Sequence, residues 1–525
     1  MTRRLITAAC SLVSAAALTG CMVGPDYKRP DPVMPTTYSA TQPASTQPEV
    51  VVAPVDLTRW WETFNDPKLN RLISDGVASN FDVQIAQARV RQARAQLDAT
   101  VGAIFPTVDA SAAYSRSKAS ETSFAGIPTG TANSGGTSGG ATGGGSTGGS
   151  SSSSLSNFST GETDLFQGGF DAGWEIDVFG GKRRAIEGAQ RTLEATIDGR
   201  RNALVTLLSE VARNYILLRG YQYQLATVDK NVASQNDSLQ LQQQKLAAGI
   251  STDLTVAQAQ ALLASTQAQR PPLQTNIEQT IHRLGVLLGR EPTALMDELV
   301  TQEPLPVGPP SIPPGLPSEL LRRRPDVRQA ERQLAAATSS IGVATSELFP
   351  KFSLNGSIGL SSAKFTNWGD SNSLFWSVGP GVRWRIFDAG GLLANVRFEQ
   401  AAADEAMLTY RQIVYQAISD VEDSLVAYNH EQARTKALQQ SVDANRRAVD
   451  LARQLNDAGV VDFLNVLTAQ QSLYESENAL AQSQQTVSTN LVAVYKALGG
   501  GWETTEHPPA PSQGEPSTQP AVALQ

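Results

Sequence analysis

Few residues of this 525-residue chain have the types and spacing that enzyme chemistry requires. Gly144, Ser146 and Gly148 fit the Gly-x-Ser-x-Gly pattern of a serine nucleophile, which must sit on a sharp turn between a strand and a helix. They lie instead in a tract of Gly, Ser and Thr that has no apolar side chains to bury. The two cysteines and three histidines are far apart and leave no metal-ligand pattern. The sequence therefore predicts no catalytic site, no metal and no cofactor, in a chain that is not an enzyme.

Cys21 is the residue whose chemistry the sequence does indicate. A basic start and an apolar stretch over residues 5–18, too short to span a bilayer, predict a signal peptide over residues 1–20. The small residues before Cys21 resemble a lipobox, which implies cleavage before Cys21 and acylation of its thiol and new amine. Met22, rather than an Asp, follows, and by analogy with bacterial lipoprotein sorting it permits an outer-membrane destination. The alternative is a plain signal peptide with a chance cysteine.

Composition excludes two broad classes of protein. Lys and Arg number 42 against 50 Asp and Glu, a net charge of −8, which is not the clustered basic footprint of a nucleic-acid-binding protein. With 41% hydrophobic and 18% charged residues, the chain is too apolar to be disordered throughout. After residue 20 no apolar run approaches 18 residues, so a second membrane crossing would need strands of a closed barrel.

The chain matches itself in two copies. Trp174 matches Trp384 and Gly249 matches Gly459, each pair 210 positions apart. Upstream of these, Pro106 matches Pro350, which is 244 positions away. The first copy thus holds 34 extra residues, in the interval that contains the Gly/Ser/Thr tract. The predicted domains are a lipid-anchored extended segment over 21–60, repeat 1 over 61–300 with a flexible loop at 118–160, repeat 2 over 301–502, and a disordered tail over 503–525.

Each repeat carries two stretches of alternating apolar and polar residues, about 10 residues long, as a tilted transmembrane strand requires. The four stretches are 108–115, 170–178, 352–360 and 376–386. Half-buried strands of a soluble sheet would show the same alternation. The polar positions that we expect to face a wet interior include five charged residues, which pair with one another or influence ion preference: Asp171, Glu175, Asp177, Arg383 and Arg385.

The longest feature of each repeat is a Pro-free stretch of about 60 residues with apolar positions at helical spacing. At 1.5 Å per residue such a helix is roughly 90 Å long and calls for coiled-coil packing. Gly249 and Gly459 follow these stretches and suit helix C-caps. The expected helices cover residues 67–104, 185–247, 252–288 with a break at Pro271-Pro272, 392–457 and 462–498.

Four transmembrane strands cannot close into a barrel, and an open sheet edge is not tolerated in lipid. The chain must therefore oligomerise if the strands enter a membrane. Three copies would supply 12 strands around a wide lumen, and the long helices would form a matching tube. Such an assembly is a conduit.

Several motifs together resemble the TolC-like outer membrane factor family, in its lipoprotein branch that serves RND-type efflux systems. They span nearly the whole mature chain in the family's order: the segment 24–30 after Cys21, Trp60-Trp61 with Asp66-Pro67, Arg323 to Val327, Phe387 to Gly390, and Tyr495 to Trp502. The resemblance implies an α+β membrane protein that forms a homotrimer. Its 12-strand transmembrane β-barrel, four strands per chain, would be continuous with a long periplasmic α-helical barrel.

The resemblance also implies partners. The helical tips would dock a periplasmic adaptor (membrane fusion) protein, which couples the trimer to an inner-membrane RND-type pump, while the barrel and Cys21 contact outer-membrane lipid. The tip residues are Ala248, Gly249, Ile250 and Ser251 in repeat 1, and Ala458, Gly459, Val460 and Val461 in repeat 2. As helix ends, both glycines would need no such function.

The family restricts its closed end with a Leu, an Asp and an Arg on the helix after the second tip. The matching residues here are Leu464, Thr468 and Gln471, so the leucine is kept and both charges are absent. We expect an aperture held by Leu464 and polar contacts, with Asp253 or Asp462 supplying any ring of charge.

The predicted function is that of an outer-membrane exit duct of a tripartite efflux pump, which passively conducts small molecules from the periplasm to the outside. A protein-secretion duct of the same fold is one alternative. A periplasm-spanning structural lipoprotein without a pore is another, and it would require the strand patterns to belong to a soluble sheet. The sequence does not identify the substrate.

Overall fold

The computed structural model describes residues 22–31, 35, 38, 57–118, 162–309, 319 and 322–505. They fall into a strand unit, which contains the described residues 22–23, 101–118, 162–182 and 346–390, and a helical unit that contains the other described residues. The predicted signal peptide, Cys21, most of segment 21–60, the Gly/Ser-rich loop and the tail after residue 505 lie outside the described residues.

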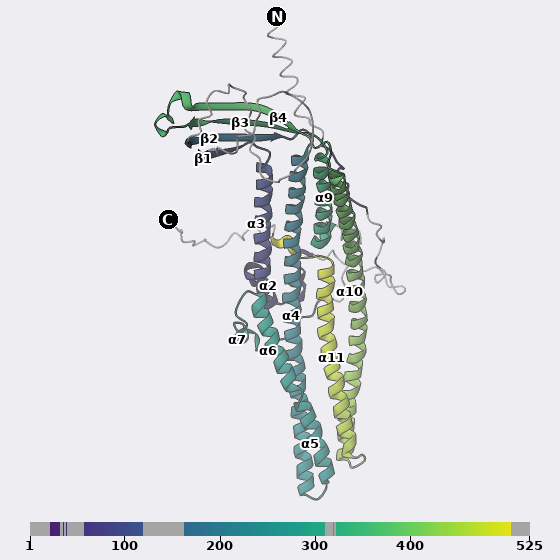
Figure 1. The fold of residues 1–525 in the computed structure, drawn as a ribbon. Helices are drawn as coiled ribbons and strands as arrows, with labels where there is room; N and C mark the ends of the chain where they lie inside the picture. Colours follow the sequence, from purple (N-terminus) through teal and green to yellow (C-terminus); the bar gives the residue numbers. More distant parts are fainter. Residues whose placement is uncertain are drawn as a thin grey trace, which may run out of the picture. The chain divides into compact units, whose positions relative to one another are not determined.

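The strand unit is one antiparallel sheet in the order β1-β2-β3-β4 (Figure 1). The strand bounds are β1 (Thr107–Lys118), β2 (Glu162–Ile176), β3 (Lys351–Ser362) and β4 (Leu374–Arg383). Two short 3-10 turns, η4 (Phe365–Asn367) and η5 (Ser371–Ser373), connect β3 to β4. All four predicted alternating stretches therefore contribute strands, and two pairs of strands far apart in the sequence share one sheet.

The register gives the sheet two chemically different faces. Phe170, Ile358 and Trp376 lie opposite one another across three strands, and their side chains are 58%, 52% and 70% exposed. One residue along, Asp171 lies opposite Ser357, whose hydroxyl is 2.8 Å from that of Ser377. Since side chains alternate along a strand, one face is apolar and exposed and the other is polar.

Two of the five charged residues predicted on the polar face lie outside the strands. Asp177 follows the end of β2 and accepts a hydrogen bond from the backbone N of Lys182 at 3.2 Å. Arg385 follows the end of β4. The prediction extended both strands too far because the alternation continues through Trp384 and Ile386, where no ladder bonds are made.

The helical unit consists mainly of two long hairpins (Figure 1). In repeat 1, α4 (Gly181–Ala247) has 67 residues and is followed by α5 (Asp253–Gln267) and α6 (Arg270–Leu287). In repeat 2, α10 (Gly391–Asp457) also has 67 residues and returns as α11 (Phe463–Ala497). The shorter helices are η3 (Leu57–Phe64), α2 (Pro67–Ser79), α3 (Phe81–Gly102), α7 (Met296–Leu299), α9 (Pro325–Ser346) and η6 (Trp502–Thr505).

The predicted single helix over residues 67–104 is wrong, because the chain forms two helices that meet at Asn80. Asn80 has an extended backbone (φ −62°, ψ 133°), and its Oδ1 accepts a hydrogen bond from the N of Val83 at 3.0 Å. Its Nδ2 donates to the carbonyl of Leu287 at 2.9 Å. A capping residue with a long-range partner thus ends one helix and starts the next.

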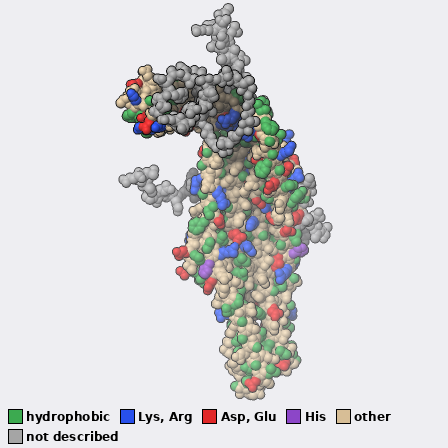
Figure 2. Space-filling model, viewed as in Figure 1, with side chains coloured by type: hydrophobic (Ala, Val, Ile, Leu, Met, Phe, Trp, Pro, Cys, Tyr) green, Lys and Arg blue, Asp and Glu red, His purple; other side chains and the backbone are tan. Residues whose placement is uncertain are grey.

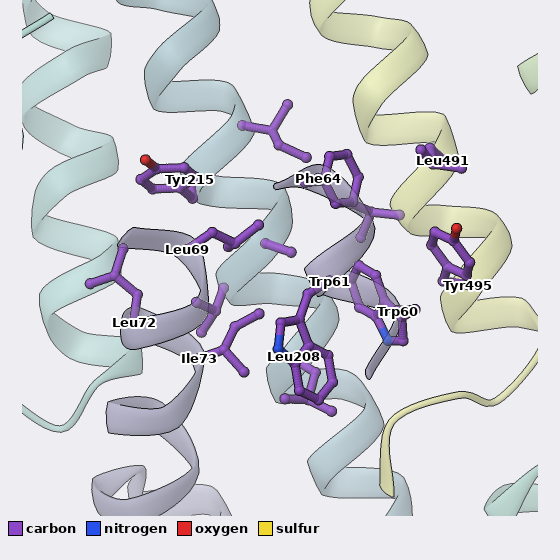
Figure 3. Packing of buried hydrophobic residues seen from close by; sticks show 14 of the residues in the cluster. Trp60, Trp61, Phe64, Leu69, Leu72, Ile73, Leu208, Tyr215, Leu491 and Tyr495 are labelled. Atoms are coloured by element: carbon purple, nitrogen blue, oxygen red, sulfur yellow. The ribbon is translucent and has the colours of Figure 1, made fainter. Parts of the chain in front are cut away.

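An aromatic core holds the helical unit together near η3 (Figure 3). Trp60 is fully buried and stacks on Tyr495 of α11, with ring centroids 5.1 Å apart. Trp61 and Phe64 meet the Trp60 ring edge-on. These rings, with Leu208 of α4, join helices from both repeats, and aromatic pairs add to the free energy of area burial.

A buried charge fixes the segment that connects the repeats. Arg219 of α4 is fully buried and donates to the carbonyl of Thr301 at 2.9 Å and to Glu303 at 2.6 Å. Glu303 also pairs with Lys68 of α2. Further along the segment, Ser488 of α11 donates to the carbonyl of Pro306 at 2.9 Å. The connecting segment is therefore bound to helices of both repeats.

None of the described helices is long and apolar enough to cross a membrane. On the face shown in Figure 2, acidic and basic side chains are interspersed over the helical unit. The end formed by α5 and the neighbouring turns shows acidic but few basic side chains.

Replacing Trp60 with Ala should lower the free energy of unfolding of the helical unit by about 3–5 kcal/mol, because a large buried side chain leaves a cavity. Urea unfolding followed by circular dichroism measures the change. Val307→Ala, at a side chain that is 72% exposed in the same unit, should change it by less than about 0.5 kcal/mol. Equal effects of the two substitutions would contradict the central place given to Trp60.

Candidate functional site

The two turns at the ends of the long helices have the same backbone design. Gly249 and Gly459 have φ of +74° and +72°, which glycine adopts without strain. Ile250 N donates to the carbonyl of Lys245 at 2.8 Å, and Val460 N to that of Leu455 at 2.9 Å. These bonds close Schellman-type helix ends.

The turns present apolar side chains to solvent. Ile250 and Val460 are 77% and 69% exposed, and a Cβ added to either turn glycine would meet nothing within 4 Å. The Lys245 amine lies 3.7 Å from a carboxylate oxygen of Asp457, which links the ends of α4 and α10. The eight predicted tip residues thus lie on two neighbouring turns, and their role in docking stays a prediction.

Behind the turns, a small apolar cluster joins three helices. Leu239 of α4, Leu263 of α5 and Phe463 of α11 are each at most 8% exposed and pack together. This cluster is much smaller than the aromatic core. It packs α5 against the first two turns of α11.

The residues predicted for the aperture lie on one face of α11. Leu464, Thr468 and Gln471 line one wall of a groove of about 460 Å³, and α5 forms the other wall. The Thr468 hydroxyl donates to the carbonyl of Leu464 at 2.9 Å. Gln471 Nε2 donates to Glu475 Oε1 at 3.0 Å.

Asp253 and Asp462, the predicted sources of a charge ring, lie at helix starts instead of in this groove. Asp253 is the first residue of α5, and Asp462 is the N-cap of α11 without a side-chain capping bond. A carboxylate at a helix N-terminus is favoured by the helix dipole, so both have a structural reason for their positions. The carboxylate that does line the groove is Glu475, which our sequence analysis missed.

A family comparison identifies the chain. The family model described as "Outer membrane efflux protein" matches residues 72–290 and 316–500, which is most of the chain. The chain belongs to the outer membrane efflux protein family. The predicted outer-membrane location and efflux role are therefore confirmed, and the family consists of transport channels rather than enzymes.

Individual relatives cover the chain almost completely. The solvent efflux pump outer membrane protein SrpC of Pseudomonas putida is 31% identical over 491 residues, 93% of this chain and 97% of SrpC. The probable outer membrane lipoprotein SilC of Salmonella typhimurium is 26% identical over 493 residues, 94% of this chain and 98% of SilC. The solved outer-membrane channel OprN is 34% identical and superposes with a TM-score of 0.80, covering 92% of this chain and all of OprN.

Within the helical unit of this efflux protein, residues 24–31 are held tightly against α4 and α9. Gly24 has φ of +90°, and a Cβ there would lie 2.4 Å from the Cα of Gly342 in α9. Asp26 accepts a hydrogen bond of 2.6 Å from Arg184 of α4, whose side chain is 3% exposed. Burial opposes the charge of Arg184, but its hydrogen bonds to Asp26 and Glu187 outweigh that effect and raise its pKa.

A second buried charge continues this attachment. Glu331 of α9 is 5% exposed, and it accepts from the Tyr27 hydroxyl at 3.4 Å and pairs with Arg29 at 3.1 Å. Burial, followed by the charge of Glu331, raises the pKa of Tyr27 well above its usual range. Residues 24–31 are therefore fixed by close packing and ion pairs.

Between the two apolar clusters, the contacts of α4 with α11 are polar. Gln224 donates to Gln485 at 2.7 Å, and Asn231 donates to Glu477 at 3.0 Å. Gln235 is 3% exposed, and neither its Nε2 nor its Oε1 has a hydrogen-bond partner among the described residues. We call this row the polar seam: Gln224, Asn231, Gln235, Glu477 and Gln485. A buried amide without partners costs free energy, so Gln235 weakens this part of the helical unit.

Two substitutions in the polar seam should have opposite effects. Gln235→Leu should raise the free energy of unfolding by about 1–2 kcal/mol, because it removes a buried amide that has no partner. Gln224→Leu should lower it by a similar amount, because Gln485 would lose its partner. Urea unfolding of the two variants tests this pair, and a shift in the same direction for both would contradict it.

Proposed function

We propose that this protein is the outer-membrane exit duct of a tripartite efflux pump and passively conducts small molecules out of the periplasm. The observation that carries this proposal is the sheet, with one apolar exposed face, one polar face and two outer strands. Among the described residues, β1 pairs only with β2 and β4 only with β3. Such edges need partners in a lipid environment.

A homotrimer satisfies that requirement. Three copies of a four-stranded sheet make a barrel of 12 strands, with the apolar faces toward lipid and the polar faces toward a lumen. In this arrangement Asp171, Glu175 and Arg383 line the lumen, with Asp177 and Arg385 at its rim. The likeness to the OprN channel supports this reading.

The internal repeat is proposed on contacts as well as on sequence. Asn80 donates to the carbonyl of Leu287 at 2.9 Å, and Arg324 donates to that of Ala497 at 3.2 Å. The donors are 244 residues apart and the acceptors 210, the two offsets found in the sequence. We keep the proposed boundaries of 61–300 and 301–502 for the repeats, after a signal peptide (1–20) and an anchored segment (21–60), with a tail over 503–525.

The helical hairpins would form the periplasmic part of the duct. Helices of 67 residues are about 100 Å long, and three protomers would supply a closed ring of them. The exposed apolar turns at Ile250 and Val460 are suited to docking an adaptor protein that couples the duct to an inner-membrane RND-type pump. Acyl chains on Cys21 would anchor the chain just before residues 24–31. In that segment, Asp26 pairs with Arg184 and Arg29 pairs with Glu331.

The duct proposal predicts a trimer with discrete single-channel conductance. The mature protein, purified from outer membranes in detergent, should have the mass of three chains and insert into planar bilayers as small, stepwise currents. Substitutions that loosen the turns should enlarge these currents. A monomer that never conducts would contradict the shared barrel and favour a structural lipoprotein, and passage of unfolded protein would favour a secretion duct.

The docking proposal predicts that the turns tolerate Asn but not Val. At φ near +70°, Gly249→Val and Gly459→Val each cost about 1–2 kcal/mol of local strain, whereas Asn adopts this conformation more readily. Crosslinking to the adaptor and resistance to pump substrates should fall with Val and persist with Asn. Unchanged crosslinking and resistance in both Val variants would contradict the assignment of the turns.

A further inference from the structure

The groove between α5 and α11 has the size and lining of a small-molecule site. Its volume of about 460 Å³ lies within the range of drug-sized ligand pockets. Each wall is one helix face: α5 contributes Gln258, Leu262 and Ser265, and α11 contributes Thr468, Gln471 and Glu475. The groove is therefore lined by both apolar and polar side chains.

Among the described residues that line this groove, Glu475 alone is charged. One carboxylate oxygen accepts from Gln471 at 3.0 Å, and the other has no hydrogen-bond partner among the described residues. Tyr474 lines the groove beside it. A carboxylate with a free oxygen next to an aromatic ring is the chemistry that attracts organic cations, through charge and through the ring face.

A neighbouring carboxylate on the same helix has a different environment. Glu477, two residues further along α11, is engaged by Arg446 at 3.0 Å and by Asn231 at 3.0 Å. Its charge is compensated in the polar seam. Glu475 points to the other side of the helix, on the stripe of Leu464, Thr468 and Gln471 at helical spacing.

We propose that this groove is a binding site for amphipathic organic cations at the aperture, with Glu475 supplying the charge and Tyr474 the aromatic surface. The proposal rests on the proposed function in that it places the groove on the path of transported molecules. It deepens that function, because a duct with this lining holds organic cations more strongly than anions of similar size. Asp253 and Asp462, which lie outside the groove, would affect small inorganic ions at the entrance.

Binding of two fluorescent aromatic probes of opposite charge tests this site. The full mature protein in neutral detergent is titrated with ethidium, a cation, and with anilinonaphthalene sulfonate, an anion, and empty micelles are subtracted. Ethidium should bind to the unsubstituted protein, and added salt should weaken that binding. Glu475→Gln should weaken ethidium affinity roughly 3- to 10-fold and leave the anion unchanged. Tyr474→Leu should weaken it as well.

A variant that gains affinity for ethidium separates an effect on the site from damage to the fold, because a damaged fold would only lose affinity. Gln258→Glu adds a carboxylate to the opposite wall and should strengthen ethidium binding, whereas Asp253→Asn with Asp462→Asn should leave it unchanged. Equal affinity of the unsubstituted protein and Glu475→Gln would overturn the proposal, as would a loss confined to the Asp253 and Asp462 variant. Conductance of the same preparations is measured separately, so that failure of the duct and failure of the site are distinguishable.

Discussion

The backbone of the four-stranded sheet sets the strongest constraint on this protein. Each strand residue carries a donor and an acceptor that need partners, and in this sheet the outward groups of β1 and β4 have none within the described ladder. The exposed apolar face, with Trp376 and Phe170 on it, makes water an unfavourable surrounding, and lipid cannot satisfy the open edges. Association of chains edge to edge satisfies the open edges, and surrounding lipid covers the apolar face. The outer-membrane location of the family supplies the lipid.

Apolar packing within the helical unit decreases from η3 toward the turns. Near η3, Trp60 and Tyr495 form part of a large apolar core, and the buried Arg219 fastens the connecting segment. Toward the turns, that packing gives way to the polar seam and to the small cluster around Phe463. Because local opening begins where few apolar contacts resist it, the turn end should open before the core does.

The sequence predicted the regular features well because each depends on local chemistry. Alternation located all four strands, and Gly249 and Gly459 located both turns, since a φ near +70° favours glycine. The break in the first predicted helix was missed because it involves a long-range contact. The break at Asn80 depends on the carbonyl of Leu287, about two hundred residues away, and no local breaker such as Pro marks it.

Glu475 shows why the candidate site was predicted only in part. The resemblance directed attention to Thr468 and Gln471, where charges are absent, and then to the acidic residues closest in sequence, Asp253 and Asp462. The groove, however, is defined by a helix face, and residue 475 lies two helical turns beyond Thr468 on that face. A search at spacings of three and four residues from Leu464 would have reached it. Helical periodicity, rather than distance along the sequence from the turn, therefore identifies the carboxylate that lines the groove.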